Sequence, residues 1–334
     1  MVLTPAHGAV MTPPVHFMPL QDDCETTKQQ SKWVTLAHWV VGLIMAYVVF
    51  AVTVYFSPLV PPITTNVINP MWNVNPKVKG SGHSEMSVYT YFFFGMILPV
   101  FVAFLLVRFV TKGVPAPVPH VSHWLQRKPR FLYSLVSYGE LLFLAVTVVG
   151  NIIIFYYFYI ARVDAKSTYD KRMNVAAKTL GFSCVYNMVF LALPASRHCF
   201  WMEWLAIPYA HGIKYHRWLG IATVLAAILH MAFYVRDYYV KNDLEALLPC
   251  FNCDVGKEGK DHWINTFGWI SFFCMFIMGV TSIAYVRRRY YNVFYVTHFL
   301  FVPATAFAIM HYGPIAIWLF AGVVLYIVNR MMSS

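Results

Sequence analysis

The chain has 334 residues and a formal net charge of +11; 59% of its residues are hydrophobic, 18% are aromatic and only 12% are charged. This apolar share excludes a soluble globular domain and indicates an all-α, multi-pass integral membrane protein. The positive charge does not indicate nucleic-acid binding, because basic residues in such chains usually flank membrane spans and no nucleic-acid module is visible.

The first 32 residues are polar and contain Asp22, Asp23 and Glu25, so they are expected to form a cytosolic tail rather than a cleavable signal peptide. Hydrophobic runs of membrane-crossing length then predict eight spans, at about 33–56, 90–110, 133–160, 178–195, 215–235, 263–286, 291–311 and 314–330.

A proline-rich, basic linker lies between the second and third spans. It suggests a division into two accessory membrane helices with their linker, residues 33–132, and a six-helix core, residues 133–334.

Orientation follows from the short loop between the sixth and seventh spans, which contains Arg287, Arg288 and Arg289. Short loops rich in arginine stay on the cytosolic side, so eight spans place both termini in the cytosol. We expect the protein to lie in the plasma membrane.

Four histidines lie in the apolar segments of the core: His216 and His230 in the fifth span, His298 and His311 in the seventh. The members of each pair are about 20 Å apart along a helix, so one of each pair lies in each leaflet. Imidazoles at membrane depth are costly unless they bind something, and haem iron commonly takes two facing imidazoles. The pattern predicts an inner haem b held by His216 and His298, and an outer one held by His230 and His311.

Helix periodicity distinguishes the two pairs. The fourteen steps from His216 to His230 return to within about 40° of the same face, as one straight helix requires. The thirteen steps from His298 to His311 leave the two about 220° apart, so this helix needs local rewinding, a kink or tilted haem planes. Pro303 lies between them and is the expected cause of a kink.

These residues carry a family resemblance. The stretch from Asn187 to Arg197, the sequence Tyr215-His216-Arg217-Trp218-Leu219-Gly220, and Phe294-Tyr295-Val296-Thr297-His298 continuing to His311 are similar to the ferric reductase transmembrane domain, whose superfamily holds metalloreductases and NADPH oxidases. The two extra N-terminal spans resemble the plant-type ferric-chelate reductases more than the NADPH oxidases.

The resemblance implies an oxidoreductase that passes electrons through two b haems from a cytosolic dehydrogenase module carrying FAD and NADPH. No such module is visible in the sequence, so it is expected either on a missing continuation of the chain, which we favour, or on a separate partner. Two histidines on each iron leave no open position, so the acceptor takes its electron at the haem edge.

Four cations are candidates for the haem propionates or for an anionic substrate. Arg197 and Arg217 are predicted near the inner haem, and Lys178 and Arg236 near the outer one. The alternative is ordinary interfacial lysine and arginine, which reach the lipid headgroups or follow the positive-inside bias.

The acceptor is predicted to be a ferric chelate, with copper also possible. NADPH oxidases carry a further histidine one turn beyond the outer ligand, and Tyr234 occupies that position here. Superoxide production from oxygen is therefore the alternative. A transporter that uses histidines as a proton relay, without haem, is a more remote one.

Two smaller features complete the prediction. Cys250 and Cys253, in the loop after the fifth span, indicate a local disulfide on the outer side, with a metal-delivery site as the alternative. Glu140 is the one acidic residue in the third span and is expected either to accept a hydrogen bond there or to interact with a haem-facing residue.

Overall fold

The computed structural model describes residues 32–75, 77–78, 81–111, 120–129, 135–195, 199–254 and 259–333, and all of their regular structure is helical. The predicted tail, residues 1–32, lies almost entirely outside the described residues. The helices run in the order α1 (Lys32–Thr53), α2 (Val60–Ile63), η1 (Thr64–Ile68), α3 (Asn69–Met71), α4 (Met86–Phe92), η2 (Phe93–Ile97), α5 (Leu98–Thr111), α6 (His120–Leu125), α7 (Tyr138–Ile153), η4 (Ile154–Ile160), α8 (Tyr169–Leu191), η5 (Leu193–Ala195), α9 (Phe200–Trp204), α10 (Tyr209–Val240), η6 (Leu244–Leu247), α11 (Lys260–Thr281), α12 (Ala284–Arg289), α13 (Tyr291–His298), α14 (Phe301–His311) and α15 (Ile315–Ser333).

Seven helical stretches among the described residues are long and apolar enough to cross a membrane, which confirms the multi-pass all-α class. They correspond to the first seven predicted spans. The eighth, 314–330, corresponds to α15, whose 19 residues extend about 28 Å, close to the thickness of a hydrocarbon layer of about 30 Å.

Helix boundaries differ from the hydropathy prediction where polar residues continue a helix. The fourth span begins at Tyr169 rather than 178, because the Thr168 hydroxyl accepts a hydrogen bond from the Lys171 amide and caps the first turn. The sixth ends at Thr281, and the three arginines form the separate short helix α12.

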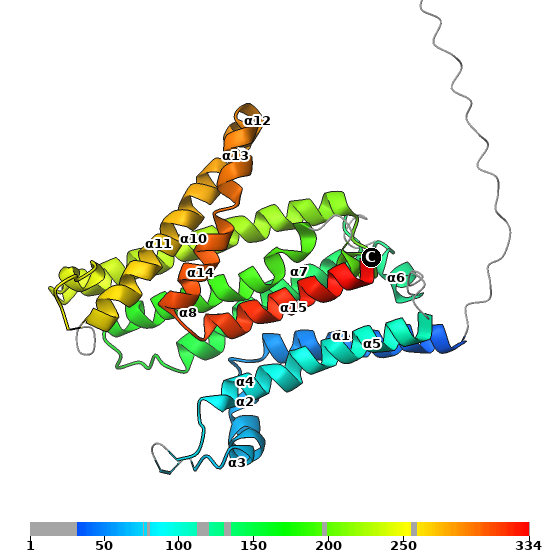
Figure 1. The fold of residues 1–334 in the computed structure, drawn as a ribbon, viewed down its shortest axis with the longest axis horizontal. Coiled ribbons are helices and arrows are strands. Elements are labelled where there is room, and N and C mark those ends of the chain that lie inside the picture. Colours follow the sequence, from blue (N-terminus) through cyan, green and yellow to red (C-terminus); the bar gives the residue numbers. More distant parts are fainter. Residues whose placement is uncertain are drawn as a thin grey trace, which may run out of the picture.

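The helices form an elongated bundle (Figure 1). The C-terminus, α6 and the start of α1 lie at one end of it. Helix α8 packs against α10 along most of its length, and α11 packs against α14. The hairpin of α11 and α13 leans away from the other helices, and α12 lies at its tip.

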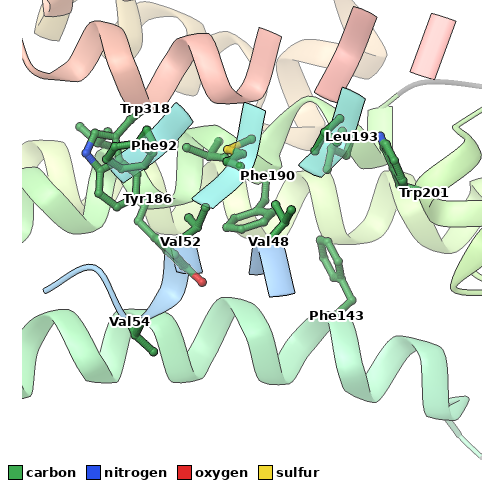
Figure 2. Packing of buried hydrophobic residues seen from close by; sticks show 14 of the residues in the cluster. Val48, Val52, Val54, Phe92, Phe143, Tyr186, Phe190, Leu193, Trp201 and Trp318 are labelled. Atoms are coloured by element: carbon green, nitrogen blue, oxygen red, sulfur yellow. The ribbon is translucent and has the colours of Figure 1, made fainter. Parts of the chain in front are cut away.

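The main hydrophobic core joins the accessory helices to the predicted six-helix core. Figure 2 shows Val48 and Val52 of α1 and Phe92 of α4 beside Tyr186 of α8 and Trp318 of α15. The Tyr186 side chain is 1% exposed, and its hydroxyl donates to the Val146 carbonyl at 2.9 Å. The buried surface therefore crosses the boundary that we predicted near residue 132.

The seventh span is broken between its two histidines. Helix α13 ends at His298 and α14 begins at Phe301. Pro303 has no N–H to donate to the Phe299 carbonyl four residues earlier, and that carbonyl accepts from the Val302 amide at 3.0 Å instead. The predicted kink is present, and it changes the relative direction of the two histidines.

Candidate functional site

The four histidines form two facing pairs. His216 and His298 have ring centroids 6.1 Å apart with planes at 63°, and His230 and His311 have centroids 6.3 Å apart with planes at 86°. All four side chains are half-buried. Helix α10 supplies one member of each pair, and the broken seventh span supplies the other.

Three of the four imidazoles are oriented by the backbone of a neighbouring helix. The Nδ1 atom of His216 lies 2.9 Å from the Leu191 carbonyl, that of His230 lies 2.7 Å from the Ala177 carbonyl, and that of His311 lies 2.8 Å from the Ile264 carbonyl. A carbonyl can only accept, so each Nδ1 carries the proton and each Nε2 keeps its lone pair. Metal-binding histidines are normally held in this way.

Two glycines make room for the outer pair. A Cβ atom on Gly181 of α8 would lie 2.9 Å from Cε1 of His230, and one on Gly268 of α11 would lie 2.8 Å from Nδ1 of His311. Both distances are shorter than a side chain tolerates without displacement of the ring. Small residues are therefore required where these helices pass the imidazoles.

The fourth imidazole differs from the others. The Nδ1 atom of His298 is buried and has no hydrogen-bond partner among the described residues. His298 is the last residue of α13 and comes directly before the break in the span. Among the described residues, its ring packs against that of Phe294, with centroids 5.1 Å apart, and is not held by a carbonyl.

The separations fit a shared iron. An imidazole nitrogen binds a metal at about 2 Å and its ring centre lies about 1 Å further away, so two rings on opposite sides of one metal have centroids about 6 Å apart. The described residues contain no group of three or more His, Cys, Asp or Glu side chains suited to a metal ion. Two protein ligands suffice for haem, because the porphyrin supplies the other donors.

The predicted cations lie in different surroundings. Lys178 is exposed on α8, directly after Ala177, whose carbonyl accepts the hydrogen bond from His230. Arg236 donates from Nη2 to Asp170 at 2.8 Å and lies over the Tyr169 ring at 4.6 Å, while its buried Nη1 has no partner among the described residues. Arg236 is therefore already largely neutralised, which the sequence did not indicate.

On the inner side, Arg217 is exposed on α10 beside His216. Arg197 lies outside the described residues. The position of Tyr234, one turn after His230, brings its ring to a centroid distance of 5.0 Å from that imidazole.

Glu140 lies in a hydrogen-bonded group near the start of α10. Its Oε2 accepts from the Ser137 amide at 2.7 Å, and its Oε1 lies 2.6 Å from Nδ1 of His211 and 2.9 Å from the Tyr215 hydroxyl. The predicted hydrogen bond is confirmed. The Ser137 side chain accepts from the Glu140 amide, so the two form a capping box, a spacing that the sequence shows. The bonds to His211 and Tyr215 join α7 to α10, and no local pattern signals them.

Cys250 and Cys253 are joined by a disulfide, as the sequence predicted. The ring of Phe251 packs edge-on against that of Trp263 at 5.7 Å, which holds this loop to the start of α11.

The comparison with known families decides what this arrangement belongs to. Residues 180–309 match the family described as ferric reductase like transmembrane component. This segment is therefore similar to a ferric reductase-like transmembrane component. It runs from α8 to α14 and contains His216, His230 and His298, and it ends two residues before His311.

Named relatives share the same region. The chain is 33% identical over 155 residues to ferric reduction oxidase 7, chloroplastic, of Arabidopsis thaliana, an alignment that covers 46% of this chain and 19% of that protein. It is 29% identical over 168 residues to the probable metalloreductase AIM14 of Yarrowia lipolytica, covering 48% and 28%, and 27% identical over 118 residues to human dual oxidase 2, covering 31% and 8%. The aligned ferric reductase-like region spans about a fifth of the length of the plant relatives.

Proposed function

We propose that this chain is the membrane haem component of a ferric-chelate reductase. Electrons enter at the inner pair, His216 and His298, from a cytosolic flavin and NADPH module on the same or a partner chain. They leave from the outer pair, His230 and His311, to a ferric chelate outside the cytosol.

The observation that carries this proposal is the presence of two facing imidazole pairs, each with the separation that one iron requires. Haem b, when bound, supplies a one-electron carrier at each pair. The four imidazoles would hold the iron, and the Leu191, Ala177 and Ile264 carbonyls would raise the basicity of three of them. A transporter with a histidine relay has no need for paired rings with their Nε2 atoms free.

The proposal that the acceptor is a ferric chelate is supported by the names of the relatives and by Tyr234. A ferric reduction oxidase and a metalloreductase are among the named relatives. The phenol of Tyr234 lies against His230, where the resemblance to NADPH oxidases would have placed a histidine for oxygen. The dual oxidase relative keeps oxygen as the second candidate acceptor, with superoxide as the product.

Lys178 is the better candidate for an anionic group at the outer pair. Its ammonium is exposed and belongs to the helix whose Ala177 carbonyl holds His230. Arg236 contributes less long-range attraction, because Asp170 compensates its charge. Arg217 is the described cation nearest in sequence to the inner ligand, and we propose it, with Arg197, for the inner propionates.

The test is a reoxidation experiment on the full chain, purified with its haem and reduced with dithionite under anaerobic conditions. Stopped-flow mixing with ferric citrate, a cupric chelate or dissolved oxygen at equal concentration then follows the loss of the reduced b-type bands. We expect ferric citrate to be the fastest acceptor. A faster reaction with oxygen, with superoxide trapped by cytochrome c, would replace the reductase by an oxidase.

A further inference from the structure

A second site lies between α7, α8 and α10. A cavity of about 750 Å³, open on one side, is lined by α7 with η4, by α8 and by α10. This volume is in the range of pockets that hold a small organic molecule. Most of its wall is aromatic or aliphatic, and the residues used below are Asn151, Asn187, Tyr215, Trp218 and Ala222.

The cavity opens sideways into the membrane. Exposed side chains of its rim include Val148, Ile152, Tyr156 and Trp218, and all of them belong to helices of membrane-crossing length. A ligand therefore enters from the hydrocarbon phase and is itself lipid-soluble. The rim also includes π-helical turns of η4, a conformation that is frequent at functional sites.

One wall carries a polar group with unused bonding capacity. The Asn151 amide donates to Oδ1 of Asn187 at 2.8 Å and accepts from the Ser183 hydroxyl. No hydrogen bond among the described residues uses the Nδ2 group of Asn187, which lines the cavity. A buried amide donor in an apolar wall calls for a ligand with a hydrogen-bond acceptor, such as a carbonyl or hydroxyl oxygen.

The cavity is next to the inner histidine pair. Asn187 lies one helical turn, about 6 Å, before Leu191, whose carbonyl binds His216. Tyr215, in the cavity wall, is the neighbour of His216 in the chain. A redox-active ligand here is thus separated from the inner pair by little more than the thickness of one helix.

A route for protons begins at the same wall. The Tyr215 hydroxyl donates to Glu140, and Glu140 is bonded to His211, whose side chain is 49% exposed. A hydroxyl both donates and accepts, so Tyr215 can pass a proton on without a net change in its own charge. The route ends at the end of the bundle that we predict to be cytosolic.

We propose that this cavity binds an isoprenoid quinol, which is a second electron donor to the inner haem, in addition to the cytosolic flavin and NADPH module. The inference rests on the proposed function, because it requires a haem at His216 and His298. Oxidation of the quinol to the quinone breaks two O–H bonds and releases two electrons and two protons. The electrons pass one at a time to the inner haem, and the protons pass through Tyr215 and Glu140 to His211. Asn187 donates to the quinone oxygen.

Binding is tested first, by a readout that does not need haem. The full chain in phosphatidylcholine nanodiscs is irradiated with an azidoquinone, and the labelled peptides are identified by mass spectrometry. We expect label in the segments around residues 147–160 and 215–222, and we expect excess decylubiquinone to remove it. Failure of the haems to bind would leave this result intact, so the two proposals fail separately.

A filled cavity provides the matched comparison. Ala222 is exposed in the cavity and Ile221, its neighbour, is exposed outside it, so Ala222→Trp blocks the site while Ile221→Trp adds the same bulk to the lipid face. Label should be lost in the first variant, with Ala222→Leu intermediate, and kept in the second. A parallel experiment uses a photoactivatable phosphatidylcholine. If this lipid labels the same segments and decylubiquinone does not reduce the labelling, the cavity is a lipid site and the proposal is overturned.

Electron transfer is tested with the haem-loaded chain, without NADPH or flavin. Decylubiquinol should reduce the inner haem anaerobically, and Ala222→Trp should slow this reaction about tenfold or more while Ile221→Trp does not. Tyr215→Phe keeps the ring and removes the hydroxyl, so it should keep the azidoquinone label and slow the reduction by quinol. No reduction by quinol in protein that dithionite reduces fully would overturn the donor role.

Discussion

The outer and inner histidine pairs have nearly the same ring separation but different support. In the outer pair both Nδ1 atoms meet carbonyls, and Gly181 and Gly268 clear the space beside the rings. In the inner pair only His216 has such a partner, and His298 stands at a helix end with its Nδ1 unbonded among the described residues.

The difference shows two ways to place a ligand. The outer pair is fixed by four packed helices, α8, α10, α11 and α14, so its geometry exists before a metal binds. The inner pair is completed when its ligand binds, because His298 packs against the Phe294 ring but has no carbonyl partner among the described residues. The inner site also lies at the foot of the hairpin that leans away from the bundle (Figure 1), where a neighbouring module would have access.

Removal of single histidines should have the largest effect on haem binding at the two pairs. His230→Ala or His311→Ala should abolish the outer haem and leave the inner one, and His216→Ala or His298→Ala should do the reverse. The reduced b-type absorbance should fall by about half in each case, since one of two equivalent chromophores is lost. His262→Ala, in the first turn of α11 and outside both pairs, is the control and should leave both haems in place. Loss of both haems from every single variant, in protein that is still folded, would contradict two independent sites.

Substitution of the glycines should damage the outer site alone. A Cβ on Gly268 meets the His311 ring, so Gly268→Ala should displace it and weaken its bond to Ile264. Disrupted ligand support of this kind typically costs about 10-fold to 100-fold in metal affinity. Gly220→Ala is matched, because its Cβ would lie 3.9 Å from the nearest Leu191 carbon and needs no displacement. Titration of haem into the apoprotein measures the haem affinity of each variant at each site. Equal losses of affinity at the two sites in Gly268→Ala would show that the glycine does not act through His311.

In the wild-type chain the inner haem should be held less firmly. His298 lacks the carbonyl partner that each outer ligand has, and the missing support predicts about tenfold weaker binding at the inner site. Transfer of haem to apomyoglobin should therefore proceed in two phases, with the inner haem leaving first. The His230→Ala and His216→Ala variants identify the phases. Faster loss of the outer haem would contradict the assignment of greater support to the outer pair.

Neutralising the cations near the outer pair should have the smallest effects, which concern the rate at which an anionic acceptor reoxidises the protein. Lys178→Gln should slow reoxidation by ferric citrate and flatten its salt dependence, because attraction over more than about 8 Å is screened at physiological ionic strength. Arg236→Gln should slow it less, because Asp170 already balances that charge. A neutral acceptor is the control, and the rate of reoxidation by it should be unaffected by either substitution. A larger effect of Arg236 would show that its unpartnered Nη1, and not Lys178, meets the anion.

Much of this arrangement follows from the sequence, for reasons that are local. The apolar runs locate seven spans, and the spacing of the histidines predicts which rings face each other. Thirteen residues do not complete whole turns, which predicts local rewinding, a kink or tilted haem planes, and the structure has a break directly after His298.

The features that local patterns could not supply all depend on contacts between helices. The Glu140–His211 bond joins residues 71 positions apart, and Asp170 neutralises Arg236 across 66 positions. Gly181 and Gly268 look like ordinary helix glycines until the opposing imidazoles are placed. Helix α8 extends to Tyr169 because a side-chain cap, not hydropathy, sets its start.

The most direct test of the account is the haem content of the purified, well-folded wild-type chain. Pyridine haemochrome spectra with a protein determination by amino-acid analysis give the number of haems per polypeptide. Two facing histidine pairs predict two haems b per chain. A value of one or none would contradict the central claim that both pairs hold iron.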